Sequence, residues 1–478
     1  MTDTPWPYAT ITSLSQDLQK GRLSPVELVE RSLDRINTLD PHLNAFRLVS
    51  PERALTQARA AEAALKAGLS SGPLHGISYA AKDLFDAQGL PTTAGCHLLA
   101  DNIAVEDSAA IRRLTQAGMI LLGKTNTVQF AYSGIGINHD HGTPHNPWHR
   151  VHHVPGGSSS GSGVAVAAGL VPMALGSDTG GSVRIPASLC GTTGLKTTVG
   201  RVSRAGVYPL SWSLDSVGPL TRSVEDAALV YQALQGPDPN DETTWGRPPQ
   251  NVLAGLRDGV AGLRLAFGET VFWEDADPEV AKAVRECGHV FETLGASVRS
   301  IALPEAEEAR RLNPRGLIIA AEAYTLNQKW VENHYDQLDP VVAERILLGK
   351  AIRAPEYLQN LRAWTDLRAR VTHALRDIDA LLVPATILPA RPFTELDADR
   401  DVYTTHNLAY LRNTTIGNIL NLCGVAVPCG YTCQGLPVGL MIYGKAFHEE
   451  MILRVGHAFQ QATDWHRRTP DLAWIAKG

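Results

Sequence analysis

The chain has 478 residues, of which 44% are hydrophobic and 19% charged, so it can bury a large apolar core as an ordinary folded protein does. Its net charge of −6 argues against a nucleic-acid partner, and its six cysteines contain no C-x-x-C pair, which argues against a disulfide framework and a zinc knuckle. The most apolar run, 163–176, is too short to cross a membrane, and the N-terminus has no basic, apolar leader, so we expect a cytoplasmic protein without a membrane partner.

Helices and buried strands alternate from the start of the chain. A helix is predicted at 24–36, where Ser24 is the N-cap, Pro25 is the first helical residue and Glu27 completes a capping box. A strand at 76–85, a helix at 106–118 and a strand at 119–126 follow. Residues 163–176 predict a helix of small residues and then another buried strand.

The second half continues this alternation. It predicts a strand at 262–268, a helix at 278–296, strands at 380–386, 424–430 and 436–444, and a helix from about 449 to 462. The pattern indicates the α/β class, with a mixed, largely parallel central β-sheet covered by helices on both faces. We predict a single domain over 1–478, in which the helix-rich segment 305–376 is an insertion over one edge of the sheet.

Residues 118–125 match the P-loop pattern G-x-x-x-x-G-K-T. A P-loop needs a flexible backbone that curls around phosphate, but the four middle residues are Met-Ile-Leu-Leu. They predict a buried strand rather than a nucleotide site.

Two further patterns leave alternatives open. The stretch "GSSSG" at 157–161 matches a nucleophile elbow centred on Ser159, as in an α/β-hydrolase-type esterase, although the preceding "HRVHHVPG" is a poor strand end. Six histidines crowd into a loop interrupted by glycine and proline, which favours a polar surface loop over a metal site. They are His139, His141, His145, His149, His152 and His153.

The stretch 155–186 combines many glycines and serines with a buried apolar middle. Glycine in a core costs about 0.5–1 kcal/mol per residue relative to alanine, so a compensating role is expected, such as N–H groups aimed at a developing negative charge. A nucleophilic serine also needs a base, and no histidine lies between His153 and His289. Lys82, at the end of a strand-like run, is the candidate base if burial keeps it neutral. The alternative is a surface lysine paired with Asp83 or Asp86.

Taken together, these motifs resemble the amidase signature family of serine hydrolases over essentially the entire chain. The matching motifs are "AAKD" (80–83), "GKTN" (123–126), "NP" (146–147), "PGGSSSGSG" (155–163), "GSDTGGSVRIPASLCGTTGLKTT" (176–198), "GRVSRAGVYPLSWSLDSVGPLTRSVED" (200–226) and the run "VPCG" to "GLPVGLMIYG" (427–444). The segment from Pro155 to Thr198 is the most specific of them.

The resemblance implies the amidase signature fold and a Ser–cisSer–Lys triad. Ser182 is then the nucleophile, Ser158 the bridging serine 24 residues before it, and Lys82 the base. The family pattern also implies an acyl-enzyme and an oxyanion hole made by backbone N–H groups, here those of Thr179, Gly180, Gly181 and Ser182. Asp178 and Arg184 flank this loop, and we expect them to brace it by pairing. Ser160 stands where the family commonly has glycine.

The motifs leave the substrate open. Tyr132 and Ser133 are candidate pocket residues, and the insertion 305–376 is expected to shape the pocket. We predict hydrolysis of a small-molecule amide, such as an aryl or alkyl amide or anilide, with carbamate (urethane) and ester cleavage as further activities. The alternative within the family is the glutaminase component of a tRNA-dependent amidotransferase. We expect no cofactor and no metal ion in the site, while a homodimer stays open.

Overall fold

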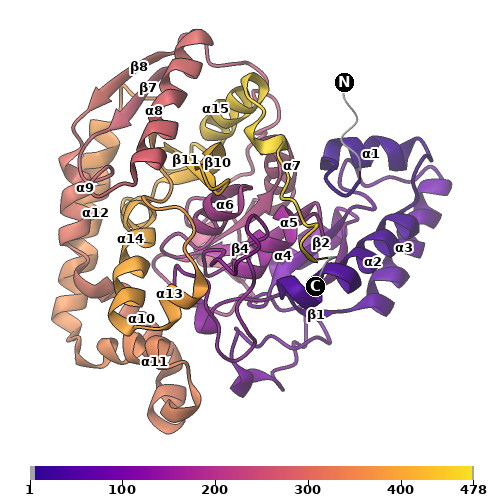
Figure 1. Ribbon diagram of the computed structural model, residues 1–478, viewed down its shortest axis with the longest axis horizontal. Coiled ribbons are helices and arrows are strands. Elements are labelled where there is room, and N and C mark those ends of the chain that lie inside the picture. The colour runs from indigo at the N-terminus through magenta and orange to yellow at the C-terminus, as the bar shows by residue number, and fades with distance from the viewer. Residues whose placement is uncertain (1–5, 476–478) are drawn as a thin grey trace.

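The computed structural model describes residues 6–475 and contains one mixed sheet of 11 strands (Figure 1). From edge to edge the strands are β1 (Phe46–Val49), β3 (Ile120–Thr125), β2 (Ser78–Lys82), β4 (Met173–Asp178), β6 (Ser216–Thr221), β5 (Thr193–Lys196), β10 (Cys423–Tyr431), β11 (Pro437–Gly444), β9 (Ala380–Pro384), β7 (Arg264–Gly268) and β8 (Ser297–Ile301). The α/β class and the mixed sheet are therefore confirmed.

The sheet is less parallel than the sequence led us to expect. Strand β2 is parallel to β3 and β4, and β7 is parallel to β8 and β9. The other neighbouring pairs are antiparallel. One reason is that β10 and β11 are joined by a short turn, which only antiparallel neighbours permit.

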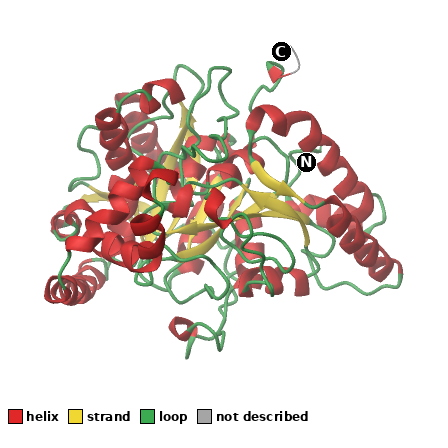
Figure 2. Cartoon of the chain, turned by 90° about the horizontal axis from the view of Figure 1, so that it is seen from below, coloured by secondary structure: helices red, strands yellow, loops and turns green. Residues whose placement is uncertain are grey.

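Helices cover both faces of the sheet, and strand residues point to the two faces in turn. In β2, Tyr79 and Ala81 belong to one hydrophobic cluster and Ala80 to the other. The face of Tyr79 is covered by α1 (Ile11–Gln19), α4 (Ala109–Gln116), α7 (Val224–Leu234), α8 (Pro278–Thr293) and α15 (Glu449–Ala462). Figure 2 shows the strands running between the helices.

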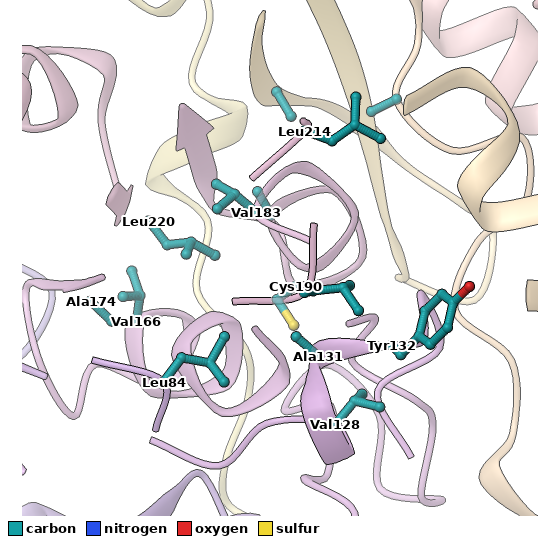
Figure 3. Packing of buried hydrophobic residues seen from close by; sticks show 14 of the residues in the cluster. Leu84, Val128, Ala131, Tyr132, Val166, Ala174, Val183, Cys190, Leu214 and Leu220 are labelled. Carbon is teal, nitrogen blue, oxygen red and sulfur yellow. The ribbon is translucent and has the colours of Figure 1, made fainter. Parts of the chain in front are cut away.

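The second face carries the larger set of helices. They are α2 (Pro25–Leu43), α3 (Pro51–Lys66), α5 (Ser160–Ala167), α6 (Arg184–Cys190), α9 (Pro304–Arg311), α10 (Leu317–Asn333), α11 (Pro340–Leu347), α12 (Ala354–Ala374) and α14 (Arg400–Ile419), with α13 (Phe393–Asp397) in a smaller cluster beside them. Figure 3 shows part of this core, in which Val166 of α5 lies next to Ala174 of β4.

Several predicted elements are confirmed with their local causes. Helix α2 begins where expected, and the Ser24 hydroxyl accepts a hydrogen bond of 3.0 Å from the backbone N–H of Glu27. The P-loop-like segment falls on β3, where every strand residue is buried, so the interpretation as a buried strand is confirmed. The helix expected from about 449 to 462 coincides with α15.

The segment 305–376 lies between β8 and β9 and is filled by α9 to α12. Figure 1 shows α9 and α12 beside β7 and β8, at the opposite end of the molecule from α1, α2 and α3. That this segment is an insertion into a single domain stays a prediction. None of the helices within residues 6–475 is long and apolar enough to cross a membrane.

Short 3₁₀ helices complete the described elements: η1 (His97–Leu99), η2 (Gln129–Ala131), η3 (Glu242–Thr244), η4 (Pro314–Gly316), η5 (Tyr335–Gln337), η6 (Leu348–Ala351) and η7 (Trp465–Arg467).

Candidate active site

Lys82 is the last residue of β2, and its side chain is fully buried. Its Nζ lies 2.7 Å from Ser158 Oγ and 2.9 Å from Ser177 Oγ. Burial lowers the pKa of Lys82 to about 7, although the charges of Asp215 and Asp178 act in the opposite direction. The amine is therefore partly neutral near pH 7 and can accept a proton.

The surroundings of Lys82 exclude the alternative of a paired surface lysine. Asp83 is bound instead to Lys124, whose Nζ lies 2.8 Å from its Oδ1. Within residues 6–475, Lys82 has only two hydrogen-bond partners, and both are neutral hydroxyls. An ammonium group has three N–H donors, so this environment leaves the charged form under-satisfied.

Ser158 lies in the loop before α5, and the peptide bond between Gly157 and Ser158 is cis. The Ser158 carbonyl accepts hydrogen bonds from Thr127 Oγ1 at 2.9 Å and from the N–H of Val128 at 3.3 Å. The Gly157 N–H donates to the carbonyl of Gly134 at 2.8 Å. The segment 127–134 thus holds the backbone of Ser158 in place.

Ser182 lies beside Ser158, since its carbonyl accepts a hydrogen bond of 3.2 Å from the Ser159 N–H. The preceding Gly181 has φ +140°, and a Cβ at this position would lie 2.2 Å from Thr414 Oγ1, so the turn requires glycine. Among the described residues, no hydrogen bond joins the hydroxyls of Ser182 and Ser158. The structure therefore brings Lys82 and Ser158 into contact. Ser182 lies close to Ser158, but their hydroxyls form no hydrogen bond, as is common before substrate binds.

The loop before Ser182 offers free donors. In the part of the chain that the structure describes, the backbone N–H groups of Thr179, Gly180, Gly181 and Ser182 form no hydrogen bond. The Gly180 carbonyl is held from behind by Thr414 Oγ1 at 2.6 Å and by Thr415 Oγ1 at 3.1 Å. These N–H groups are thus available for an anionic oxygen.

Asp178 and Arg184 form a fully buried ion pair with two hydrogen bonds of 2.9 Å. Burial raises the pKa of the Asp178 carboxyl, but the charge and hydrogen bonds of Arg184 outweigh it and hold this pKa below its usual range. Asp178 Oδ2 also accepts from the Val183 N–H at 3.1 Å. Asn418 of α14 and Tyr443 of β11 complete the cluster through Arg184. The pair braces the loop that lies between its two members.

Tyr132 and Ser133 are both buried in the segment that holds Ser158. The guanidinium of Arg345 lies 4.2 Å from the centre of the Tyr132 ring. Ser133 Oγ accepts a hydrogen bond of 2.6 Å from Tyr403 Oη and donates one of 3.1 Å to Asn407 Oδ1. Helices α11 and α14 therefore fix the position of both residues.

A cavity of about 210 Å³ opens next to the Lys82 partner Ser177. It is also lined by Thr179, Tyr208, Trp212 and Asp215. Asp215 accepts hydrogen bonds from Thr179 Oγ1 at 2.5 Å and from the Ser211 N–H at 3.0 Å, and burial raises its pKa.

The sequence reasoning missed Ser177 and Asp215. The local sequence holds no signal for Ser177, because its contact with Lys82 depends on the pairing of β2 with β4.

Two serines next to Ser158 differ from it. Ser159 has no strand before it, which the nucleophile elbow requires, so the esterase alternative loses its structural basis. The Ser160 hydroxyl is buried and has no hydrogen-bond partner among the described residues.

Among the described residues, no three of the crowded histidines form a group that could hold a metal ion. His139 binds Asp339 at 2.5 Å and Asp397 at 2.8 Å, and its hydrogen bond to Asp339 is the main cause that raises its pKa to about 9. His145 and His152 stack on each other with ring centres 4.6 Å apart.

Residues 27–453 match the family described as Amidase. The sequence is 38% identical over 489 residues to the A component of glutamyl-tRNA(Gln) amidotransferase from Roseiflexus sp. (strain RS-1), covering 97% of this chain and 98% of that protein. A structure described as part of a vestigial protein complex that reveals the origins of an s-triazine catabolic enzyme superposes with a TM-score of 0.88 and 34% identity, over 95% of this chain and 98% of the other. Native peptide amidase from Stenotrophomonas maltophilia superposes with a TM-score of 0.84 and 30% identity, over 98% of this chain and 100% of the other.

Proposed function

Because the chain belongs to the amidase family, we propose that it hydrolyses the C–N bond of a carboxylic amide through an acyl-enzyme on Ser182. The observation that carries this proposal is the buried contact of 2.7 Å between Lys82 Nζ and Ser158 Oγ. It supplies a base of suitable pKa together with a hydroxyl that can pass a proton onward.

In the first half of the reaction, neutral Lys82 accepts a proton from Ser158, which takes one from Ser182 Oγ. The Ser182 oxygen forms a bond to the amide carbon. The free N–H groups from Thr179 to Ser182 hold the oxygen that becomes negative, and each well-placed donor contributes about 3–4 kcal/mol.

In the second half, the proton returns through Ser158 to the leaving nitrogen as the C–N bond breaks. The acyl group then remains on Ser182 as an ester. Water attacks this ester and gives its proton to the same relay, which releases the acid and restores the Ser182 hydroxyl.

For the substrate, the similarity to the A component of glutamyl-tRNA(Gln) amidotransferase along nearly the whole chain favours glutamine. These relatives support the glutaminase alternative of the sequence analysis better than the small-molecule amidase that we expected first. In this role the chain is a glutaminase that supplies ammonia to partner proteins.

A stand-alone amidase is the second candidate, supported by the likeness to peptide amidase and by one feature of the segment 305–376. Glu322 of α10 accepts hydrogen bonds from the hydroxyls of Ser211 and Ser213 and, at 2.6 Å, from Tyr357 of α12. These bonds fasten the segment to the loop of Trp212, which lines the cavity. We propose that the segment shapes the substrate pocket.

Purification of the chain alone tests the proposal. Substrates should include glutamine, aliphatic amides, anilides, a carbamate and a p-nitrophenyl ester. If the wild type releases acid from any of these amides and Ser182→Ala does not, the result supports the proposed chemistry. Efficient turnover of simple amides without a partner identifies the stand-alone amidase, whereas glutamine turnover that depends on added partner proteins identifies the glutaminase. If no amide is hydrolysed either with or without added partner proteins, the proposal is contradicted.

A further inference from the structure

Cys96, His97 and Asp140 come together from two loops outside the candidate active site. One possible ligand atom from each of these residues lies within 4.8 Å of those of the other two. Cys96 is fully buried, whereas the His97 side chain is 48% exposed and that of Asp140 is 10% exposed. The cluster is therefore closed on the thiol side and reachable from solvent through the imidazole.

The protein positions this cluster through hydrogen bonds and leaves atoms that could bind a metal ion. Asp140 Oδ2 accepts from the His97 backbone N–H at 2.8 Å and from Gln129 Nε2 at 3.0 Å, and lies 2.9 Å from His97 Nδ1. The Cys96 thiol forms a side-chain hydrogen bond with Asp140, and burial raises the pKa of this thiol. Within residues 6–475, no N–H group donates to Asp140 Oδ1. One residue further along, His141 has a buried Nε2 that also lacks a partner in the described chain.

We propose that Cys96, His97 and Asp140 bind a thiophilic divalent cation, for which Zn²⁺ is the best match. Zinc takes thiolate, imidazole and carboxylate ligands at about 2.0–2.3 Å. The thiolate and the carboxylate supply two negative charges, which balance the charge of the ion. On binding, the S–H bond of Cys96 breaks, the sulfur–metal bond forms and the proton passes to the buffer. Water fills the remaining position.

The position of the cluster suggests a structural ion rather than a catalytic one. Asn138 Nδ2 donates to the carbonyls of Gly95 at 2.8 Å and Thr127 at 2.6 Å. Thr127 in turn donates to the carbonyl of Ser158. A metal bound to Cys96 and Asp140 would add a second link between the chain around Cys96 and the chain around Asn138. Asn138 contacts the segment 127–134, which holds the backbone of Ser158. The proposed amide hydrolysis uses none of the three ligands, so the two proposals can fail independently.

Cobalt(II) titration of the purified full chain, after treatment with EDTA and removal of the chelator, tests the site. We expect one Co²⁺ per chain and a near-ultraviolet charge-transfer band of a thiolate–cobalt bond. Cys96→Ser should abolish this band. Cys433→Ser is the matched control, because Cys433 is an exposed cysteine beside Glu279, and it should retain the band.

The remaining ligands are tested with Zn²⁺ by calorimetry. His97→Ala and Asp140→Asn should each weaken binding by at least about tenfold. The partly exposed His97 keeps the test valid even if Cys96→Ser fails to fold. Zn²⁺ should also raise the melting temperature of the wild type and not that of His97→Ala. Absence of the band in the wild type, its persistence in Cys96→Ser, or its loss only in Cys433→Ser would overturn the proposal.

Discussion

Lys82 donates a hydrogen bond of 2.9 Å to Ser177, the residue directly before the loop-bracing Asp178. A neutral amine has two N–H donors and one lone pair. If Ser177 accepts one N–H, the lone pair is free to receive the proton of Ser158, which lies 2.7 Å away. We therefore expect Ser177 to act as a positioning residue that determines which hydroxyl gives its proton to Lys82.

Ser177→Ala should lower kcat by about tenfold to a hundredfold, because the amine loses the contact that orients it. The same change removes an acceptor that stabilises the ammonium form, so the pKa of Lys82 falls and the acidic limb of the pH–rate profile moves to lower pH. Ser177→Thr keeps the hydroxyl and should restore both values. A fall in kcat without movement of the limb, or without rescue by threonine, would show a purely structural role.

The wild-type pH profile should reflect Lys82 directly. Because only the neutral amine can act as base and its pKa is about 7, kcat/KM should fall roughly tenfold for each pH unit below 7. Lys82→Met should remove most activity together with this limb. Stopped assays across pH 5–9 measure both. A limb that survives in Lys82→Met would assign it to another group.

Lys82 should also cost the protein stability. Its pKa is 10.5 when unperturbed and about 7 in the folded chain, so between these values the unfolded state binds more protons than the folded one. Stability therefore rises with pH across this window. Lys82→Met should remove the contribution of Lys82 to this slope and raise the free energy of unfolding at pH 7 by a few kcal/mol, about 1.4 kcal/mol for each pKa unit. Urea titrations at pH 7 and pH 10 provide the comparison.

Serine substitutions separate the nucleophile from its neighbours. Ser182→Ala should abolish turnover and labelling by a fluorophosphonate, and Ser158→Ala should lower turnover by about a thousandfold or more because the relay is broken. Ser159→Ala is the matched control and should keep most of the activity, since no step uses its hydroxyl. Mass spectrometry of the labelled peptide identifies the modified serine. Label on Ser159 would instead favour the nucleophile elbow.

Breaking the buried pair should destabilise the fold. Arg184→Met leaves the Asp178 carboxylate buried without its partner, which costs about 3–5 kcal/mol. Adding Asp178→Asn removes the unpaired charge, so the double variant should be more stable than Arg184→Met alone. Chemical denaturation of the wild type, Arg184→Met, Asp178→Asn and the double variant measures the coupling. Additive losses would mean that the two residues act independently.

Patterns within a single segment of the sequence were enough to predict some of the helices. The capping residues before α2 and the apolar period of α15 identified both helices. Strands β5 and β6 were missed, because "TGLK" and "SVGPLT" contain glycine and proline and gain their strand structure from the neighbours that cover them.

The same limit applies to the site. The resemblance pointed to Lys82 and Ser158, which are in contact. It did not point to Ser177, because its contact with Lys82 follows from the pairing of β2 with β4, two strands far apart in the sequence. Likewise, nothing in the local sequence places Asp140 beside Cys96 and His97, although the adjacent thiol and imidazole are visible in it.

The brace around Ser182 has a consequence for synthesis of the protein. Lys82, Ser158 and Ser182 leave the ribosome long before Asn418 and Tyr443, which hold Arg184 in its buried place. A nascent chain that ends before β11 contains Lys82, Ser158 and Ser182 but lacks Tyr443, one of the two residues that hold Arg184. Amide cleavage therefore requires β11, the last strand in chain order, and incomplete chains are expected to be inactive.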